Sequence, residues 1–346
     1  MKLLLFNYAM DENSQLFSHQ KIVAEKLLGH FDFIDVITVY KASDIFSDKL
    51  SVSSTGWENG KPLLNILKFY KKAIPKLFKH RRGYVFSHMT EVQSFLIAII
   101  CRVLGIRHVL WYAHKSKSPF LYLAYPFIDV IATSTKGSCP IESKRVKTIG
   151  QAIDAEIFNM PQTAPSIPPL RWYHIGRLDP SKNLEAIIDC LSYFRDLGIP
   201  LSLDLFGTPS SNVHLEYARN VRDNLCKGKD WVKFHGAVNK KDIPKIANDH
   251  DGFIHAYMGS LDKAVLEAVF ARRVVISCNP EFMKEFSSHS SDVSIPENIL
   301  KDLLGDLFSS SQENVLTEIE RRYDLVMKRH ELNRWIQELT TIIKLP

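Results

Sequence analysis

The chain has 346 residues, with 45% hydrophobic and 24% charged residues and a formal net charge of +6. That length exceeds one ordinary domain and suits two, and the composition is normal for a globular protein with sizeable cores. No apolar run approaches the roughly 18 to 20 residues that span a bilayer. Because Asp11 and Glu12 follow the short apolar start at once, we interpret residues 2–7 as a first strand and not as a signal peptide.

The five cysteines are widely spaced, and the sequence contains no CxxC motif or Cys/His cluster. This distribution favours free thiols in a reducing cytosol and argues against a zinc site. The positive net charge suits an anionic partner, but no nucleic-acid recognition motif accompanies it. We therefore expect no nucleic acid among the partners.

Short β-branched or aromatic runs alternate with segments of helical periodicity along the first half of the chain. The pattern predicts helices at residues 18–29, 61–79 and 91–104. Strands this apolar fit a parallel sheet that is covered on both faces. The predicted strands are residues 2–7, 33–39, 84–87, 108–113, 130–133 and 146–149.

A Pro-rich segment interrupts this alternation, with four prolines between residues 158 and 169. Proline cannot continue a helix or a central strand, so residues 161–170 are predicted to be a linker. The alternation then restarts, and residues 312–343 are predicted to be helical throughout. The predicted strands of this half are residues 171–175, 201–206, 232–235, 252–256 and 274–277, with helices at 184–197, 215–226 and 263–271.

Two successive doubly wound units predict an α/β protein with two Rossmann-like domains and a cleft between them. In the second unit, Gly176 permits a tight exit from the strand 171–175, and Arg177 and Lys182 project from the following turn. Two cations beside a helix N-terminus form a receptor for a diphosphate. The alternative interpretation is a pair of surface cations on a loop.

Residues 255–270 form a second strand, turn and helix. Gly259 and Ser260 lie where backbone N–H groups could face an anion or sugar hydroxyls. Glu267 lies on the helix among apolar neighbours and needs a partner, because an unpaired buried carboxylate is costly. That partner is either Lys263, one turn earlier, or a pair of ribose hydroxyls.

Several segments resemble glycosyltransferase family 4, whose members are retaining enzymes of the GT-B fold. GRLDPSKNLEAII, LDLFGTP, VKFHGAVNKKDIPKI and GSLDKAVLEAV, at residues 176–188, 203–209, 232–246 and 259–269, resemble its donor domain. SHM, LWYAHKSKSPF and KTIGQAIDAEIF, at residues 87–89, 110–120 and 147–158, resemble its acceptor domain. The similarity runs in order over most of the chain.

The resemblance implies an acceptor-binding domain at residues 1–160 and a donor-binding domain at 171–328. Residues 329–346 are then a C-terminal helix that packs back toward the first domain. It also implies that Arg177, Lys182 and His114 are the catalytic residues, with the two cations on the donor diphosphate and His114 facing the sugar. The implied donor-binding residues are Gly176, Gly207, Gly236, Val238, Gly259, Ser260, Leu261 and Glu267.

Glu267 would hold the ribose, and the backbone from Gly236 to Val238 would meet the base. The scheme resembles a metal-free one, so no cofactor or metal is expected. Asp249 and Asp251 form an Asp-x-Asp pattern of the kind that binds a metal in another fold, but they fall between a helix end and a strand, far from the phosphate turns in the chain, and we do not interpret them as a metal site. Many members of the family carry two glutamates separated by seven residues, and Gly259 stands at the first of these positions here.

The first strand is followed by residues 8–19 and not by a Gly-Gly loop. The acceptor candidates are Asp11, His19 and His88. Ser18 is a candidate helix cap, and a packed histidine is the alternative for His88.

Between Lys61 and Arg82 the chain has eight Lys or Arg residues and no acidic residue, interleaved with apolar ones. Such a segment either lies on an anionic membrane or packs one face on the first domain while its lysines face water.

The function that the resemblance implies is sugar transfer, with retention, from a nucleoside-diphosphate sugar to a glycan or lipid-linked glycan. The expected setting is envelope or exported polysaccharide synthesis in the cytoplasm, in contact with the inner face of the plasma membrane. A non-catalytic sugar-nucleotide-binding subunit, which Gly259 favours, and a GT-B sugar-nucleotide epimerase stay open as alternatives. The sequence leaves the donor base, the sugar, the acceptor and the linkage open.

Overall fold

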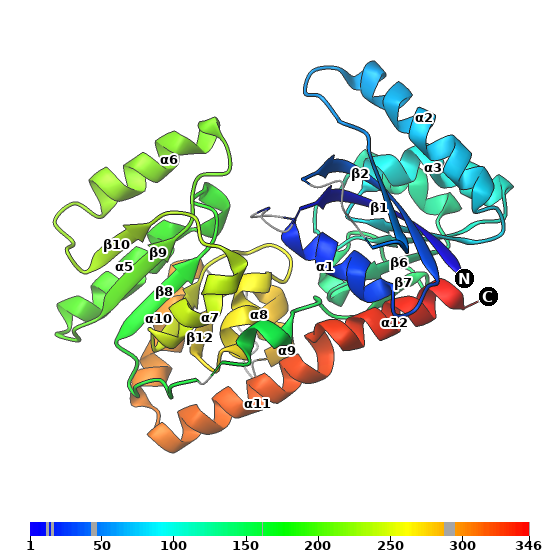
Figure 1. Cartoon of the computed structure of the whole chain (residues 1–346). Coiled ribbons are helices and arrows are strands. Elements are labelled where there is room, and N and C mark those ends of the chain that lie inside the picture. The colour runs from blue at the N-terminus through cyan, green and yellow to red at the C-terminus, as the bar shows by residue number, and fades with distance from the viewer. Residues whose placement is uncertain (12–13, 15–16, 43–46, 161, 287–294, 346) are drawn as a thin grey trace. The chain divides into compact units, whose positions relative to one another are not determined.

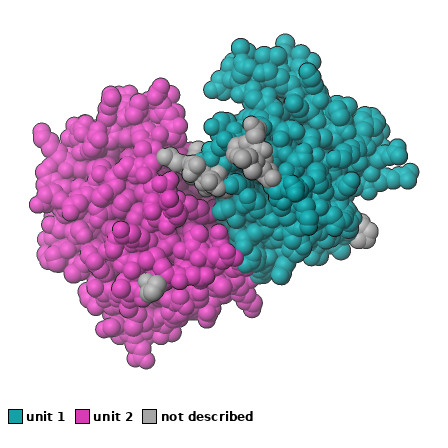
Figure 2. Space-filling model, in the orientation of Figure 1, with its two compact units in different colours: residues 1–152, 332–346 teal, residues 153–331 magenta. Residues whose placement is uncertain are grey.

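The structure is a computed structural model that describes residues 1–11, 14, 17–42, 47–160, 162–286 and 295–345 (Figure 1). The described chain divides into two compact units, which Figure 2 shows in separate colours. Unit 1 comprises Met1–Ala152 with Leu332–Pro346, and unit 2 comprises Ile153–Glu331. The Pro-rich segment therefore lies within unit 2, and the chain leaves unit 1 after Ala152 and returns to it at Leu332.

Within the described residues, unit 1 has a seven-stranded parallel sheet in the order β3-β2-β1-β4-β5-β6-β7. Leu3 and Leu5 face one side of this sheet, and Leu4 and Phe6 face the other. This double burial explains why the strand reads as a continuous apolar run. The strands are β1 (Lys2–Met10), β2 (Phe33–Lys41), β3 (Leu50–Ser54), β4 (Tyr84–His88), β5 (Arg107–Trp111), β6 (Val130–Thr133) and β7 (Val146–Thr148).

Strand β3 is absent from the prediction because its sequence, LSVSS, gives little apolar signal. It pairs only with β2 in the sheet order, and an edge strand needs less apolar surface than a central one. The helices of the first part of unit 1 are α1 (Ser18–Leu27), α2 (Pro62–Lys79), α3 (Glu91–Val103) and α4 (Pro119–Ala124).

The C-terminal helix α12 (Leu332–Lys344) belongs to unit 1. Its Trp335 is fully buried, with its ring 5.0 Å from that of Trp111 and 6.4 Å from that of Phe86. The preceding helix α11 (Gln312–His330) stays in unit 2. The prediction of one continuous helix over residues 312–343 is thus wrong at Glu331, which has an extended backbone with ψ 139°.

Within the described residues, unit 2 has a five-stranded parallel sheet in the order β10-β9-β8-β11-β12. The strands are β8 (Arg171–Ile175), β9 (Ser202–Phe206), β10 (Val232–His235), β11 (Gly252–His255) and β12 (Val274–Ser277). The order reverses at β8, which has β9 on one side and β11 on the other. Loops that leave β8 and β11 therefore flank a topological switch point, where α/β sheets bind ligands.

The helices of unit 2 pack on both faces of this sheet around separate apolar clusters. In addition to α11, these helices are α5 (Leu184–Asp196), α6 (Leu215–Asn220), α7 (Ile243–Asn248), α8 (Lys263–Phe270), α9 (Pro280–Phe286) and α10 (Pro296–Ser309). A helix is predicted from sequence at residues 215–226. Its α-helical part, α6, ends at Asn220, and a π-helical turn, Val221–Leu225, follows directly. No helix in the described part of the chain is both long and apolar enough to cross a membrane.

Candidate functional site

Glycines bring together the loops that follow β8, β9 and β10. Gly207 has φ +142°, and a Cβ atom there would overlap the carbonyl of Gly176. The Gly207 N–H donates to the Gly236 carbonyl at 3.0 Å, and the Gly176 N–H donates to the Phe206 carbonyl at 3.0 Å. Only glycine accepts this φ and this close approach at position 207.

Lys182 ends the turn between β8 and α5, and its side chain is only 8% exposed. It forms an ion pair with Asp262, which directly precedes α8. The interpretation of Lys182 as a surface cation is therefore wrong. A charge this buried requires a paired carboxylate, because removing one partner of such a pair is strongly destabilising.

Asp262 connects three elements at the switch point. Its Oδ1 accepts the Ala264 N–H at 3.2 Å and so caps α8, and His255 Nε2 lies 3.3 Å from Oδ2. Burial raises the pKa of Asp262, but the charge of Lys182 and the hydrogen bond from His255 outweigh burial and hold that pKa well below its usual range. Asp before a helix is a common cap, and that local signal could have identified the residue from sequence.

Arg177 lies on the same turn and is more open, with its side chain 47% exposed. Its Nε lies 3.4 Å from Oδ2 of the buried Asp179. Asp179 also accepts hydrogen bonds from the hydroxyls of Ser181 at 2.5 Å and Ser210 at 3.2 Å. The turn thus carries one exposed and one buried cation, each with a carboxylate of its own.

Glu267 is buried on α8, and Lys240 Nζ lies 3.9 Å from its Oε1. Burial raises the pKa of Glu267 against the opposing charges of Lys240 and Lys263. Lys240 begins the short turn Lys240–Asp242 that follows β10. The half-buried Val238, just before it, packs against the apolar cluster that contains Leu266. The carboxylate is therefore linked to the loop that carries Gly236 and Val238.

The loop after β11 contains Gly259 and the buried Ser260 and Leu261. Asn279, fully buried after β12, holds this loop. Its Nδ2 donates to the carbonyls of Tyr257 at 2.8 Å, Ser260 at 3.2 Å and Gly259 at 3.3 Å. No local pattern in the sequence marks Asn279, because it acts across the edge of the sheet on a loop about twenty residues away in the chain.

In unit 1 the structure brings two acceptor candidates together. His88 ends β4 and is buried, and its ring lies 5.4 Å from that of His19 on α1. Gln20 ties α1 to β1, because its Oε1 accepts hydrogen bonds from the N–H groups of Tyr8 at 2.8 Å and Ala9 at 3.0 Å. The third candidate, Asp11, directly follows β1.

His114 follows β5 and is exposed. Its Nδ1 accepts the Ser116 N–H at 3.0 Å, so the proton of the neutral ring is on Nε2. His114 and Asp11 follow strands of unit 1, His88 ends one and His19 lies on α1, whereas every predicted donor residue lies in unit 2.

Asp251 has a structural role. It forms an ion pair with Arg171 at 2.8 Å, and although burial opposes ionisation, the hydrogen bonds from Arg171 hold the pKa of Asp251 at about 2. Among the residues that the structure describes, no group of three or more His, Cys, Asp and Glu side chains is arranged to hold a metal ion.

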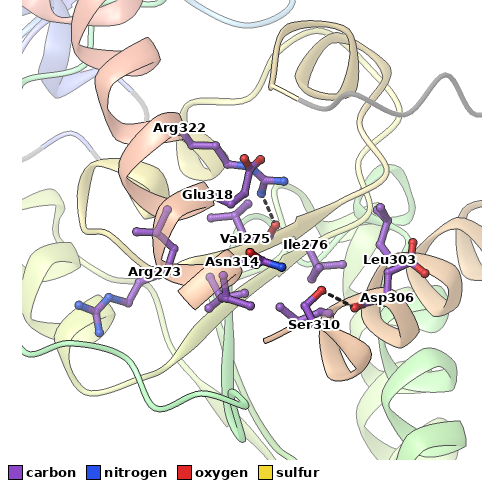
Figure 3. A pocket seen from close by; sticks show the side chains of 13 residues that line it. Arg273, Val275, Ile276, Leu303, Asp306, Ser310, Asn314, Glu318 and Arg322 are labelled. Atoms are coloured by element: carbon purple, nitrogen blue, oxygen red, sulfur yellow. Dashed lines mark hydrogen bonds and ion pairs between the residues drawn. The ribbon is translucent and has the colours of Figure 1, made fainter. Parts of the chain in front are cut away.

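A pocket of about 230 Å³ lies beside β12, between α10 and α11 (Figure 3). Arg322 lines it and donates to the Val275 carbonyl at 2.7 Å, and the Ser310 hydroxyl donates to the Asp306 carbonyl at 2.7 Å. Its lining includes none of the predicted site residues. It belongs to the packing of α10 and α11 on the edge strand.

No known protein family's sequence profile matches the chain, and no curated protein matches it significantly. Solved structures match over nearly its whole length. HepE of Anabaena, solved with UDP and glucose, has 15% identity over 100% of both chains with a TM-score of 0.74. A glycosyltransferase of Rickettsia africae has 14% identity over 100% of this chain and 99% of its own, with a TM-score of 0.73.

A sucrose-phosphate synthase of Thermosynechococcus elongatus has 10% identity over 99% of this chain and 98% of its own, with a TM-score of 0.73. Identities this low show the fold alone. With both parallel sheets and their strand orders, these matches confirm the prediction from sequence: the chain has the α/β architecture of the GT-B fold.

Proposed function

We propose that this chain is a retaining glycosyltransferase that moves a sugar from a nucleoside-diphosphate sugar to a glycan or lipid-linked glycan. The observation that carries the proposal is the group of charges at the switch point of unit 2. Arg177 and Lys182 follow β8, and Asp262 and Glu267 follow β11. Cations at this edge suit a diphosphate, and the buried carboxylate of Glu267 on α8 suits the hydroxyls of a ribose.

Each residue has a chemical role in this proposal. Departure of a nucleoside diphosphate leaves negative charge, which Arg177 and Lys182 stabilise without reorganising at the moment of reaction. Glu267 accepts hydrogen bonds from the ribose, and the backbone of Gly236 and Val238 meets the base. These fixed cations supply positive charge without a metal, so the proposed scheme needs no cofactor.

His114, His19, His88 and Asp11 serve the sugar and the acceptor in this proposal. The exposed His114 has Nε2 available as a hydrogen-bond donor toward the sugar. His19 and His88 lie against each other at the carboxyl end of β4, where a hydroxyl-bearing acceptor could contact them. The acceptor-binding domain is then unit 1, and the donor-binding domain is unit 2.

UDP is the first nucleotide to test, because HepE was solved with UDP and with UDP-glucose. We expect Lys182→Ala to weaken UDP binding in titration calorimetry by about 10- to 100-fold, as loss of a charge-assisted contact to phosphate does. Lys233→Ala is the matched control, since Lys233 is exposed on β10. Equal binding by wild type and Lys182→Ala across UDP, GDP and ADP would refute the proposed donor site.

A non-catalytic sugar-nucleotide-binding subunit is the second candidate, and glycine at position 259 favours it. Hydrolysis of UDP-glucose in the absence of acceptor separates the two candidates. A transferase hydrolyses the donor slowly and loses this activity in His114→Ala, whereas a binding subunit binds UDP without turnover. An epimerised sugar nucleotide in the same assay would instead identify an epimerase.

We also propose that α2 contacts an anionic membrane, in envelope or exported polysaccharide synthesis at the cytoplasmic face. One face of α2 packs on the sheet through Phe69, Ala73 and Leu77. Leu63, Leu67 and Phe78 nevertheless remain 77%, 67% and 58% exposed. Exposed apolar side chains among lysines suit the interface of an anionic bilayer.

Vesicle sedimentation tests this membrane contact. We expect binding to vesicles with anionic lipid and weak binding to neutral ones. The double variant Leu63→Ser, Leu67→Ser should lose binding, whereas Leu197→Ser, which removes an exposed leucine after α5, should retain it. Equal sedimentation of both variants would contradict the proposed membrane surface.

A further inference from the structure

Tyr257 lies in the loop after β11, half-buried, with Lys182 Nζ 4.4 Å from the centre of its ring. Lys182 is thus held by the carboxylate of Asp262 and also by an aromatic face. The two partners act differently. A carboxylate neutralises the ammonium, whereas the ring attracts the cation through its quadrupole and leaves its net charge in place.

The glycine at position 259 makes room for this ring. A Cβ atom on Gly259 would lie 2.6 Å from Cε1 of Tyr257, and nearer still to Cζ and Oη. The φ of Gly259 is outside the left-handed region, so its backbone conformation would accept other residues. Any larger residue at position 259 would force the Tyr257 ring to shift, because the ring occupies the volume where a side chain of residue 259 would begin.

The backbone of this loop is fixed around both residues. Asn279 donates to the carbonyls of Tyr257 and Gly259, and the Tyr257 ring lies 6.2 Å from that of the buried His255 in an edge-to-face arrangement. A ring supported in this way holds its position against a flexible side chain. Lysine is such a side chain, with a compact charge on four rotatable carbons.

We infer that Tyr257 is a positioning residue that holds the Lys182 ammonium for the donor diphosphate, and that position 259 is glycine to admit its ring. This inference rests on the proposed function. Tyr257, Gly259 and Lys182 then act together. The aromatic face keeps the Lys182 ammonium in place at the switch point when the ligand binds. The inference also explains how a donor site can operate with glycine at position 259.

Three variants measure this coupling through UDP affinity and donor-hydrolysis kinetics. Tyr257→Leu removes the ring, and loss of a cation–π contact should weaken UDP binding roughly 3- to 30-fold. Tyr257→Phe keeps the ring and should bind UDP within about twofold of wild type. Gly259→Ala displaces the ring from Lys182 and should resemble Tyr257→Leu.

The double variant Tyr257→Leu, Gly259→Ala should bind UDP no more weakly than Tyr257→Leu alone, because the obstructing ring is gone. In a Lys182→Met background, Tyr257→Leu should not weaken UDP binding any further. If the tyrosine had only a structural role, Tyr257→Leu would weaken UDP binding in this background as well. UDP affinities are compared among variants whose circular dichroism spectra match that of the wild type. If Tyr257→Leu fails to fold, Tyr257→Phe and Gly259→Ala test the inference.

The results separate this inference from the function on which it rests. Wild type that binds no nucleoside diphosphate overturns both. Wild type that binds UDP, with unchanged affinity in Tyr257→Leu and Gly259→Ala, overturns the inference alone. Additive losses in the double variant, or an undiminished effect of Tyr257→Leu without Lys182, also overturn it.

Discussion

At the residue scale, the ion pair between Lys182 and Asp262 determines how unit 2 holds positive charge before a ligand arrives. Asp262→Asn keeps the shape of the side chain and can still cap α8, but it leaves the buried Lys182 without an anionic partner. We expect a loss of stability of about 3 kcal/mol, as for other broken buried pairs. UDP should restore part of this loss, since a diphosphate supplies the missing negative charge.

Thermal unfolding with and without UDP tests this expectation, and the UDP-induced rise in Tm should be larger in Asp262→Asn than in wild type. Asp223→Asn is the control, because Asp223 pairs with Arg222 on the surface with both side chains about 60% exposed. Such pairs contribute little to stability. An Asp262→Asn protein as stable as wild type would contradict the role assigned to the pair.

A second prediction at this scale concerns His108, which is fully buried on β5 with Nε2 2.9 Å from the Ser87 hydroxyl. Burial lowers the pKa of His108 to about 3, from about 6.5 in an unfolded chain. Between these values the unfolded state binds a proton that the folded state excludes. The contribution of the neutral His108 to the free energy of unfolding is therefore fully present above about pH 6.5. It falls as the pH drops toward 3, by up to about 1.4 kcal/mol per pH unit.

Urea unfolding between pH 7 and pH 5 measures this slope. We expect His108→Gln, which can keep a hydrogen bond to Ser87, to show a shallower pH dependence than wild type. His30→Gln, at a partly exposed position before β2, is the matched control variant. An imidazole resonance of His108 that titrates near pH 6.5 in the folded protein would disprove the assignment.

At the scale of elements, the loops after β8 and β9 depend on Gly207. We expect Gly207→Ala to cost about 3 kcal/mol or more of unfolding free energy, because φ +142° is strained and the methyl group would overlap the Gly176 carbonyl. Gly236→Ala is the matched stability control. A Cβ there meets open space, so its cost should stay below about 0.5 kcal/mol.

Local sequence patterns predicted the elements well wherever both faces of a strand are buried. The bounds of β6, β8 and β12 agree with the prediction, because their apolar runs end in sharp turns. The break at Glu331 was missed for a physical reason. Residues 312–343 have helical periodicity on both sides of the break, and only the separate cores of α11 and α12 require the chain to extend there.

At the scale of the whole molecule, unit 1 is discontinuous in sequence and unit 2 is continuous. A fragment of residues 1–152 lacks α12 and therefore exposes the apolar surface on which Trp335 packs. We expect this fragment to aggregate. We expect residues 153–331 alone to fold and bind UDP, because they contain every proposed donor residue.

The matched control for unit 1 is a variant that joins residues 332–346 to residue 152 through a short Gly-Ser linker. The two crossing points are adjacent, since the Ile153 N–H donates to the His330 carbonyl at 2.7 Å, so a short linker suffices. We expect this protein to be monomeric and folded in light scattering and circular dichroism. Equal solubility of residues 1–152 with and without α12 would contradict the role of this helix.

The sequence by itself determined the alternation of strands and helices, the parallel sheets and the positions of Arg177, Lys182 and Glu267, because burial periodicity and turn chemistry are local. Only the tertiary structure decided which partners these side chains have. Asp262, Tyr257 and Asn279 meet the switch point from loops up to roughly a hundred residues along the chain from Lys182. Contacts of that kind follow from the order of strands in the sheet, which the spacing of residues along the chain does not encode.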